Sequence, residues 1–427
     1  MKTYYYDKLN TEELLSLTKR PAINLENIFE IVKPILADIK LTGLKSALNY
    51  AEKFNEPVND EIVATEKDYR QAEENLPTEI KAAIDNAYKN IYKFHKQQLP
   101  ANYSIETLPG VSCSREYRAI EKVGLYVPGG NAVLPSTILM LGIPAQIAGC
   151  KRVITCSPVK SKEFNNALLY AAKLCGIKEL YKIGGAQAIG FMAYGDKAVQ
   201  KVNKIFGPGN QYVTAAKLLV SIDPDGCAID MPAGPSEVLI IGDKNANASF
   251  IAADLLAQAE HGPDSQVIFI TNDITCSENV LSEIKIQTEL LPRKEFIKEA
   301  LKNSFILIVN DLEEAIKFSN EYGPEHLILN IKQADKYIKE ITNAGSVFIG
   351  QYSPETVGDY ASGTNHSLPT SGFAKSISGV TVESFMKSIS FQTLTLDGLK
   401  QIANTVETLA ETEGLQAHKN AVSIRLR

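Results

Sequence analysis

The spacing of apolar positions divides the chain into stretches of different character. About the first hundred residues carry apolar side chains at helical spacing, for example over residues 78–97. From about residue 118 onward, short apolar runs at 123–127 and 153–156 flank a helical stretch at 136–149. Such alternation is typical of parallel strands joined by crossover helices. The pattern therefore predicts a helical N-terminal part followed by an α/β unit.

A second alternating series follows the first. It consists of short apolar runs separated by polar or helical stretches, at residues 238–241, 267–270, 306–309, 327–331 and 347–349. Glycine and proline punctuate the region between the two series, as in Gly207-Pro208-Gly209. We therefore expect an α/β protein with two parallel-sheet units rather than one large sheet.

The C-terminal part resembles neither series. Residues 353–372 are rich in Gly, Ser, Thr, Asn and Pro, which predicts a long ordered loop. In the polar, helical tail beyond it, one apolar stripe is formed by Leu399, Ile402, Val406 and Leu409. Since no neighbouring segment offers this stripe a partner, we expect it to pack on another surface, and a second subunit is a candidate.

Composition and charge narrow the range of partners. The chain has 427 residues, with 44 basic and 50 acidic side chains and a net charge of −6. Without basic runs it lacks the electrostatic footprint of a nucleic-acid-binding protein. The N-terminus has no apolar signal core, and the most apolar stretch, 138–149, is interrupted by glycine and proline and is too short to span a bilayer. We therefore expect a cytoplasmic protein that binds neither nucleic acid nor a membrane.

The six cysteines are scattered and include no C-x-x-C pair. In a chain of this size without a signal peptide, they are expected to be reduced. Their ordinary role is that of small buried hydrophobic side chains. A cysteine nucleophile for an aldehyde intermediate is the alternative, although no surrounding sequence distinguishes one of the six.

Histidine is scarce, and four of the five histidines lie in the C-terminal half. Gln258 and His261 are three residues apart on a predicted helix, so they lie on one side of it. An imidazole nitrogen and an amide oxygen can both bind zinc, but two ligands on one turn do not define a metal site. Glu325 and His326 follow a Gly-Pro pair and form either an acid–base pair or a solvated turn entering the strand at 327–331.

Two further segments carry polar side chains that could join a site. The segment 353–366 contributes Asp359 and His366, and the tail contributes Glu413 and His418. A long loop without regular structure is often functional, but a mobile surface loop and a solvated tail are the plain alternatives.

Two glycine-containing turns stand where an α/β sheet binds ligands, between a strand and the next helix. They read Pro128-Gly129-Gly130-Asn131 and Gly184-Gly185-Ala186-Gln187. Both could equally be ordinary strand-to-helix turns that need glycine. No G-x-G-x-x-G sequence occurs in the chain, so a dinucleotide, if bound, would be held in an atypical way.

Eight stretches of the chain closely resemble motifs of the histidinol dehydrogenase family. They run in the family's order and comprise GLYVPGG (124–130), GGAQAI (184–189), KIFGPGN (204–210), DMPAGPSEVL (230–239), QAEHGPDSQ (258–266), YGPEHL (322–327), GDYASGTNH (358–366) and AHKNAV (417–422). Long motifs in register are specific. The first hundred residues or so match the family more loosely.

The resemblance implies a role for each matching position. Zn²⁺, one per subunit, would be held by Gln258, His261, Asp359 and His418. The catalytic pair would be Glu325 and His326. Besides His326 and the four zinc ligands, the substrate would be contacted by Ser236, His366 and Glu413, and NAD by Tyr126, Gln187 and Asn210.

The resemblance also implies the organisation of the molecule. It predicts a homodimer built from two incomplete Rossmann-like parallel-sheet domains, with a C-terminal tail that contacts the partner subunit. We expect an N-terminal helical segment at 1–20, a larger catalytic and zinc-binding α/β domain at 21–122 plus 237–378, a smaller NAD-binding domain at 123–236, and the extended helical tail at 379–427.

The implied reaction is the four-electron oxidation of L-histidinol to L-histidine through L-histidinaldehyde, with two NAD, as the last step of histidine biosynthesis. The residue types suit it, because zinc could orient the imidazole and amine of the substrate. Two alternatives remain. One is a related NAD-dependent dehydrogenase of another amino or sulfonated alcohol, which His366 and Glu413 disfavour. The other is a structural zinc protein without catalysis, which Glu325 and His326 disfavour.

Overall fold

The larger of two parallel sheets has six strands. The computed structural model describes residues 1–20, 25–57, 61–129, 134–161, 163–197 and 199–427. The sheet has the strand order β1-β11-β10-β9-β12-β13 and every pairing in it is parallel. Its strands are β1 (Lys2–Tyr5), β9 (Glu237–Gly242), β10 (Gln266–Thr271), β11 (Phe305–Ile308), β12 (His326–Asn330) and β13 (Ser346–Ile349). The apolar runs after residue 237 therefore predicted strands correctly.

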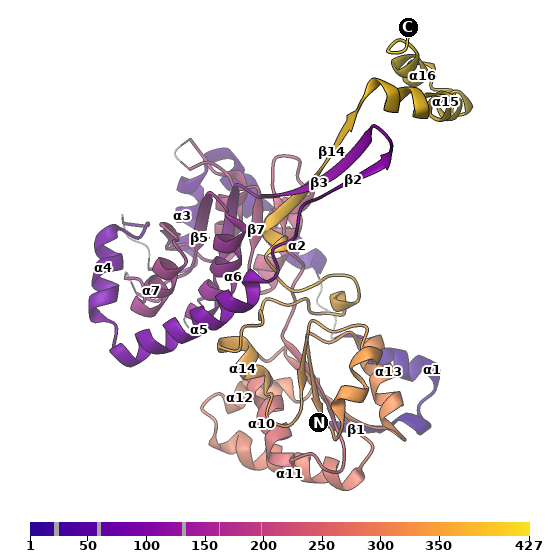
Figure 1. Ribbon diagram of the computed structural model, residues 1–427. Helices are drawn as coiled ribbons and strands as arrows, with labels where there is room; N and C mark the ends of the chain where they lie inside the picture. Colours follow the sequence, from indigo (N-terminus) through magenta and orange to yellow (C-terminus); the bar gives the residue numbers. More distant parts are fainter. Residues whose placement is uncertain (21–24, 58–60, 130–133, 162, 198) are drawn as a thin grey trace.

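Helices cover both faces of this sheet (Figure 1). Alternate residues of β9 enter different cores: Val238 and Ile240 pack with α10 (Ala248–Ala259), α11 (Ile274–Leu290) and α12 (Lys294–Ala300). Leu239 and Ile241 pack instead with α13 (Leu312–Tyr322), and α1 (Thr11–Leu17) lies against the same core. A strand buried on both faces has to be apolar throughout, as the run at 238–241 is.

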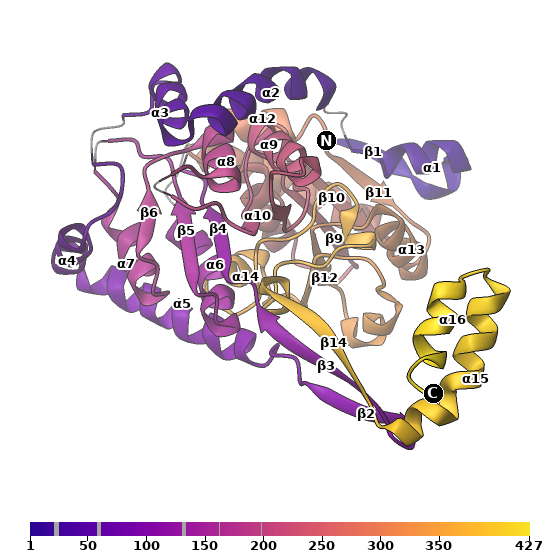
Figure 2. The ribbon, with the colours of Figure 1, turned by 90° about the horizontal axis from the view of Figure 1, so that it is seen from above.

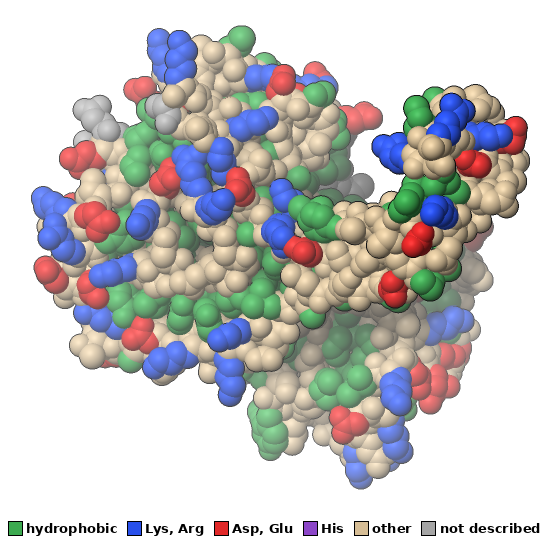
Figure 3. Space-filling view, turned by 45° about the horizontal axis from the view of Figure 1, so that its top comes forward, with side chains coloured by type: hydrophobic (Ala, Val, Ile, Leu, Met, Phe, Trp, Pro, Cys, Tyr) green, Lys and Arg blue, Asp and Glu red, His purple; other side chains and the backbone are tan. Residues whose placement is uncertain are grey.

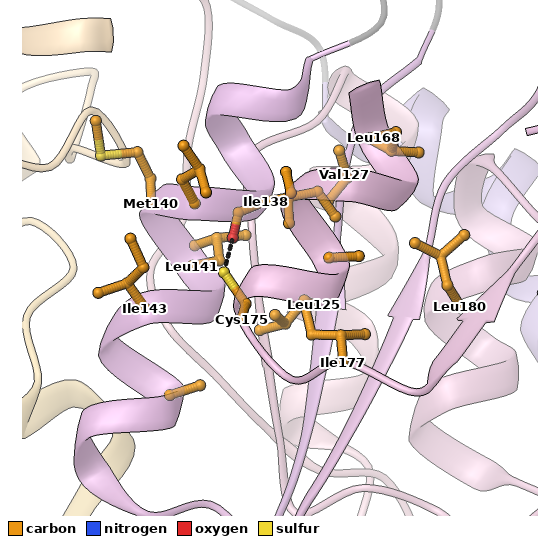
Figure 4. Close-up of a cluster of buried hydrophobic side chains, with 14 of the residues drawn as sticks. Leu125, Val127, Ile138, Met140, Leu141, Ile143, Leu168, Cys175, Ile177 and Leu180 are labelled. Carbon is orange, nitrogen blue, oxygen red and sulfur yellow. Dashed lines mark hydrogen bonds between the residues drawn. The ribbon is translucent and has the colours of Figure 1, made fainter. Parts of the chain in front are cut away.

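The smaller sheet has five strands in the order β6-β5-β4-β7-β8, again all parallel. Its strands are β4 (Lys122–Tyr126), β5 (Arg152–Cys156), β6 (Glu179–Tyr181), β7 (Lys204–Phe206) and β8 (Ala228–Ile229), and its crossover helices are α6 (Pro135–Ala148), α7 (Asn166–Leu174), α8 (Gly185–Tyr194) and α9 (Gln211–Ile222). Figure 4 shows its core, where Ile138 and Leu141 meet Leu125 and the buried Cys175 thiol donates to the carbonyl of Ile138 at 3.9 Å. The predicted α/β class with two parallel sheets is confirmed.

The N-terminal helices belong with the smaller sheet, which corrects the expected domain boundaries. These helices are α2 (Leu25–Thr42), α3 (Leu44–Lys53), α4 (Glu66–Asn75) and α5 (Thr78–Lys96). Side chains of α2 share a core with α8 and α9, and side chains of α4 and α5 share one with α6 and α7. The expected grouping of 21–122 with 237–378 is therefore wrong for these helices. Helical periodicity revealed an apolar face but not which sheet that face covers.

The first twenty residues are not wholly helical. Strand β1 pairs with β11 at the edge of the larger sheet, and only then does α1 begin. The expected helical segment at 1–20 is thus wrong for the strand. Four residues are too few for an alternating pattern to be recognised.

A three-stranded antiparallel ribbon carries the C-terminus away from the two sheets. It consists of β2 (Tyr103–Leu108), β3 (Val111–Ala119) and β14 (Met386–Leu394) and leads to α15 (Leu396–Thr412) and α16 (Gln416–Ser423). We call the ribbon and these two helices the arm; both views show it projecting from the body (Figures 1 and 2). The tail expected to be helical therefore contains a nine-residue strand before its two α-helices. The alternation of Ile389, Phe391 and Thr393 with polar residues was the sequence signal for this strand.

The arm exposes apolar side chains that its own chain does not cover (Figure 3). In α15, Leu399, Ile402 and Val406 are half-buried, whereas Leu409 is 58% exposed. On the ribbon, Tyr103, Ile105 and Phe391 are exposed. The stripe predicted from the sequence is thus only partly covered within one chain.

The segment 353–372 is not a loop throughout. Helix α14 (Glu355–Tyr360) begins after Pro354, so Asp359 lies on a helix rather than on the expected loop. Short 3-10 helices occur elsewhere, at Tyr6–Lys8, Ala334–Lys336, Ile338–Glu340, Phe373–Lys375 and Glu383–Phe385. The many small residues around a six-residue helix concealed it from the sequence pattern.

The described residues include neither a disulfide bond nor a helix that could cross a membrane. All six cysteines are unpaired, and three of them, Cys156, Cys175 and Cys276, are buried, where burial raises the thiol pKa. Among the helices that the structure describes, none has the length and apolarity needed to cross a membrane.

The fifth histidine, His95, joins the N-terminal helices to the segment after α14. Its fully buried ring donates from Nδ1 to the carbonyl of Ile91 at 2.9 Å and accepts at Nε2 from the Asn365 amide at 3.2 Å. The same amide donates to the carbonyl of Met140 at 2.6 Å. These contacts suit a neutral ring only, because a charged ring would direct Nε2–H at an amide donor.

We expect His95 to make stability depend on pH. Burial lowers the pKa of His95 below its ordinary value of 6.5, so its contribution is complete above the unfolded pKa and is lost as the pH falls below it. His95→Leu should destabilise the fold by about 1–3 kcal/mol at about pH 8, because two buried polar groups lose their partners. This difference, measured by urea unfolding, should shrink at about pH 5.5. An equal difference at both pH values would contradict the account.

Candidate active site

Polar side chains gather at the amino end of β12. Glu325 precedes this strand and His326 is its first residue, and both are buried, with 7% and 3% of their surface exposed. Helix α10 brings Gln258 to them, and α14, which lies on the side of the larger unit that faces the smaller one (Figure 1), brings Asp359. The sequence left open whether Glu325 and His326 form a solvated turn; their burial excludes it.

The ring of His326 is held by the neighbouring strand. Its Nδ1 donates to the backbone carbonyl of Glu237, the first residue of β9, at 3.1 Å, and the ring stacks on Phe348 with centroids 5.9 Å apart. Its Nε2 lies 3.5 Å from Oδ1 of Asp359 and is buried without a hydrogen-bond partner among the described residues. One ring nitrogen is therefore used for orientation and the other faces the site.

Glu325 is held by the same residue of β9. Its Oε2 accepts from the backbone N–H of Glu237 at 2.8 Å and lies 3.6 Å from Nδ1 of His326. Burial raises the pKa of Glu325 above its ordinary value. Burial alone would lower the pKa of His326, but the negative charges of Glu325 and Asp359 outweigh it and raise that pKa. Two coupled, buried groups with raised pKa values are typical of proton-transfer sites.

Three further polar side chains surround this pair. Burial would raise the pKa of Asp359, yet its neighbours His326, His366 and His261 hold it below its ordinary value. Nδ1 of His366 donates to the carbonyl of Asp359 at 3.0 Å, and its Nε2 accepts from the hydroxyl of Thr137 at 3.3 Å. Because Thr137 lies on α6, His366 links the larger unit to the smaller one.

His261 lies two residues after the end of α10, at the C-terminal end of the helix, where the sequence placed it. Its backbone N–H donates to the carbonyl of Gln258 at 3.3 Å. Although His261 is an exposed residue, the protein atoms around its ring reduce the hydration of the ring. This loss of hydration lowers the pKa of His261. Gln258 is 1% exposed; its amide nitrogen donates to Oε2 of Glu325 at 3.4 Å and lies 3.4 Å from Nδ1 of His326, and its Oε1 has no partner in the described part of the chain.

The donor set fits a borderline metal ion such as zinc. Gln258 offers a buried, unpartnered oxygen, Asp359 a carboxylate and His261 an imidazole with a lowered pKa. Within the described residues of one chain, no three His, Cys, Asp or Glu side chains are grouped so that they could hold a metal ion. Asp359 interacts electrostatically with His261, and Gln258 lies beside Glu325 and His326.

The sequence did not identify two further carboxyl groups near the site, one buried and one half-buried. Glu355 lies one helical turn before Asp359 in α14, is 1% exposed and has a pKa raised well above the ordinary value by burial. Asp254 lies one turn before Gln258 in α10, and burial raises its pKa to about 6. The spacing of four residues in each helix was the signal that could have revealed them.

The residues expected to contact NAD lie at the carboxyl ends of the smaller sheet. Tyr126 ends β4, and its hydroxyl accepts from the N–H of Gly185 at 3.1 Å. Gln187 lies in the first turn of α8, with Oε1 buried and unpartnered among the described residues. Asn210 caps α9 by accepting from Tyr212 and Val213. A buried free amide oxygen beside a helix N-terminus fits a ligand that carries hydroxyl and phosphate groups.

A buried network shapes the turn before Asn210. Gly207 has a φ of +121°, and a Cβ there would collide with the carbonyl oxygen of Tyr126. Lys217 forms a buried ion pair with Asp230 and donates to the carbonyl of Gly207 at 2.8 Å, while Asp230 accepts from the N–H of Gly207 at 2.8 Å. Glycine is therefore required at this turn by the close approach of β4.

The other glycine-containing turns are described only in part. Gly130 and Asn131 lie outside the described residues. At the second turn, Glu56 accepts from the N–H of Gly184 at 2.9 Å and from the Gln187 amide at 2.8 Å, a contact that sequence reasoning missed. Ser236 lies just before β9, and its carbonyl accepts from the N–H of Gln266 at 3.1 Å.

Two expected residues are not brought to the site by their own chain. Glu413 and His418 lie at the far end of the arm, and both are exposed (Figure 2). The ten other expected residues lie on the body, six of them at the amino end of β12 and three at the carboxyl ends of the smaller sheet. The tenth, Ser236, lies next to the residue that holds the catalytic pair.

Comparisons with known proteins identify the family. The family model described as histidinol dehydrogenase matches residues 18–426. A histidinol dehydrogenase of Photobacterium profundum is 49% identical over 427 residues, covering 100% of this chain and 96% of that protein, and a chloroplastic one of Arabidopsis thaliana is 49% identical over 429 residues, covering 100% and 92%. The crystal structure of histidinol dehydrogenase from Elizabethkingia anophelis is similar with a TM-score of 0.94 and 48% identity, covering 100% of this chain and 98% of that one.

These matches extend over the whole body and the arm, and they include the helices that the sequence motifs matched loosely. The chain therefore belongs to the histidinol dehydrogenase family, whose members are oxidoreductases.

Proposed function

We propose that the protein oxidises L-histidinol to L-histidine in two NAD-dependent steps at a zinc site, as the last step of histidine biosynthesis in the cytoplasm. The observation that carries this proposal is the gathering of Gln258, His261, Glu325, His326 and Asp359 in one cluster, in which a Gln258 oxygen and a His326 nitrogen have no hydrogen-bond partner among the described residues. Metal donors beside an acid–base pair suit an alcohol that carries nitrogen ligands of its own.

Zinc would be held by Gln258, His261 and Asp359 of one chain and by His418 of the partner subunit. When bound, the ion orients the imidazole and the amine of histidinol. His366 and Ser236, beside these ligands, are positioned to contact the substrate. Fixing both nitrogen groups would also hold the aldehyde in place between the two oxidations, which limits its loss to solvent.

His326 moves the proton of the alcohol step. Its Nδ1 is committed to the carbonyl of Glu237, so only Nε2 can exchange a proton with a substrate. In the first step, the alcohol loses its O–H proton to Nε2 and a hydride from carbon to NAD⁺, giving the aldehyde. The smaller unit carries the three residues expected to contact NAD, which are Tyr126, Gln187 and Asn210. His366 joins this unit to the larger one through its hydrogen bond with Thr137.

Glu325 serves the aldehyde step. Water adds to the aldehyde with Glu325 accepting a proton, and the hydrate then loses a second hydride to a second NAD⁺, giving the carboxylate. Burial and the N–H of Glu237 keep Glu325 in a fixed position beside His326. The alcohol step releases one NADH and one proton, and the aldehyde step releases one NADH and two protons because its product is a carboxylate. With one water consumed, the overall reaction balances as a four-electron oxidation.

The arm would complete the site of a second subunit. Glu413 and His418 lie far along it, and the exposed apolar side chains of the arm, such as Tyr103, Phe391 and Leu409, need a covering surface. A homodimer in which each arm crosses to its partner satisfies both needs, and such pairing is closed by twofold symmetry.

Replacing the two catalytic residues should separate the two steps. His326→Asn should lower the rate of histidinol oxidation by about 10²–10⁴-fold, because it removes the proton acceptor. Glu325→Gln should slow the oxidation of added histidinaldehyde by a similar factor and leave histidinol oxidation closer to the native rate. Stopped-flow measurement of NADH with each substrate tests this. Equal losses in both steps for both variants would refute the division of roles.

Mixing two inactive variants should restore activity if the arms cross. In a dimer of one His326→Asn chain and one His418→Asn chain, one site then carries both changes and the other carries neither. Random pairing of equal amounts should therefore recover about a quarter of the native activity. The dimers can be isolated with two different affinity tags. Mixed dimers without activity would show that His418 serves the site of its own chain.

A further inference from the structure

Arg20, in the segment between α1 and α2, reaches across to the larger sheet at the amino ends of β9 and β12. We propose that Arg20 is a positioning residue for the reaction: it acts through Glu237 to fix the backbone that holds Glu325 and His326. This inference rests on the proposed roles of Glu325 and His326. Arg20 lies outside the eight family-like motifs of the sequence.

The guanidinium uses all of its donors. Nε and Nη2 donate to the two carboxylate oxygens of Glu237 at 2.9 and 2.8 Å, forming a bidentate pair. Nη1 donates to the carbonyls of Thr18 and Tyr322 at 3.1 and 2.7 Å, and Nη2 also donates to the carbonyl of Gly323 at 3.2 Å. Since arginine has five N–H donors, none remains free. The group also lies 3.4 Å from the centre of the Tyr322 ring.

Glu237 connects this ion pair to the catalytic groups. Its backbone N–H donates to Oε2 of Glu325, and its carbonyl accepts from Nδ1 of His326. Its carboxylate is also the acceptor for the N–H of Ser371 at 2.7 Å. A shift of this one residue would therefore displace both partners of the acid–base pair.

Arg20 acts on the second strand as well. Tyr322 ends α13 and Gly323 follows it. Gly323 lies two residues before Glu325 and three before His326. By holding both carbonyls, Arg20 sets the path of the chain into β12. The hydroxyl of Tyr322 in turn donates to the Gln266 side chain at 2.7 Å. One side chain thus joins the two strand ends whose relative position defines the pair.

Fold stability is a poor explanation for this ion pair. The side chains of Arg20 and Glu237 are 14% and 2% exposed, so both charges lose most of their hydration. A buried ion pair often contributes no more to stability than apolar side chains of the same volume. Its directional donors, in contrast, determine geometry, and lysine cannot reproduce them because it is a point charge without a planar fork.

The experiment compares Arg20→Lys with a matched control, Arg152→Lys. Arg152 also forms a bidentate pair with a glutamate, donating to the two carboxylate oxygens of Glu179 at 2.7 and 2.6 Å. This pair joins β5 and β6 of the smaller sheet, away from Glu325 and His326. We expect kcat of Arg20→Lys to fall about 10- to 100-fold with a far smaller change in KM, as when supporting residues of a site are lost. Arg152→Lys should keep the native kcat. Circular dichroism at the assay temperature establishes that both variants are folded.

Chemical rescue provides the second measurement. In Arg20→Ala, added methylguanidinium should raise kcat with saturation, because it can occupy the vacated position between Glu237 and Tyr322. Arg152→Ala should show no such increase. Equal kcat for the native protein and Arg20→Lys, or no rescue of folded Arg20→Ala, would overturn the proposal.

The failure of this proposal is distinguishable from the failure of the proposed function. If Glu325 and His326 carry the chemistry but Arg20 does not position them, His326→Asn is inactive and Arg20→Lys is fully active. If the pair does not carry the chemistry, His326→Asn itself remains active, and the role assigned to Arg20 fails with it.

Discussion

The parallel pairing of β9 with β12 is the constraint on which the site depends. Its register places His326 opposite Val238, so the backbone of Glu237 stands beside Glu325 and His326. The backbone amide and carbonyl of one residue thereby fix the side chains of both Glu325 and His326. In most open α/β sheets, ligands bind at the carboxyl ends of the strands. In the proposed function, the larger sheet would depart from this rule and the smaller sheet would follow it.

In the proposed function, this arrangement gives each sheet a separate task. The larger sheet would supply groups for proton transfer and metal binding at the amino ends of its strands, and the smaller sheet would bind a nucleotide at the carboxyl ends of its strands. His366 joins the two, since it bonds to the carbonyl of Asp359 and to Thr137 of α6. In the proposed dimer, the arm would bring Glu413 and His418 to the site of the partner subunit. The proposed active site thus depends on three elements that are far apart in the sequence, and each has its own structural support.

The sequence predicted the strands and helices with regular apolar patterns well, but it predicted poorly which of these elements pack together. The runs at 238–241 and 267–270 are apolar throughout because both faces of those strands are buried, and this signal is local. Which sheet the helix α5 covers is not local, and that prediction failed. The same holds for Arg20 and Glu237, which are 217 residues apart. Their contact leaves no trace in the spacing of either segment.

The site residues themselves came mainly from resemblance to a family. Spacing alone placed Gln258 and His261 on one side of a helix and suggested an acid–base role for Glu325 and His326. It could not show that Asp359 approaches them, because α14 has only six residues and the segments around it are rich in small residues. Nor could it show whether Glu413 and His418 belong to the site, since their own chain leaves them exposed.

The most direct test of the account is the amount of NADH formed per L-histidinol consumed by the purified protein, with and without a chelator. The account predicts two NADH for each histidinol, L-histidine as the product, loss of turnover on chelation and recovery on addition of zinc. One NADH per histidinol with free aldehyde, or turnover that chelation leaves unchanged, would contradict it.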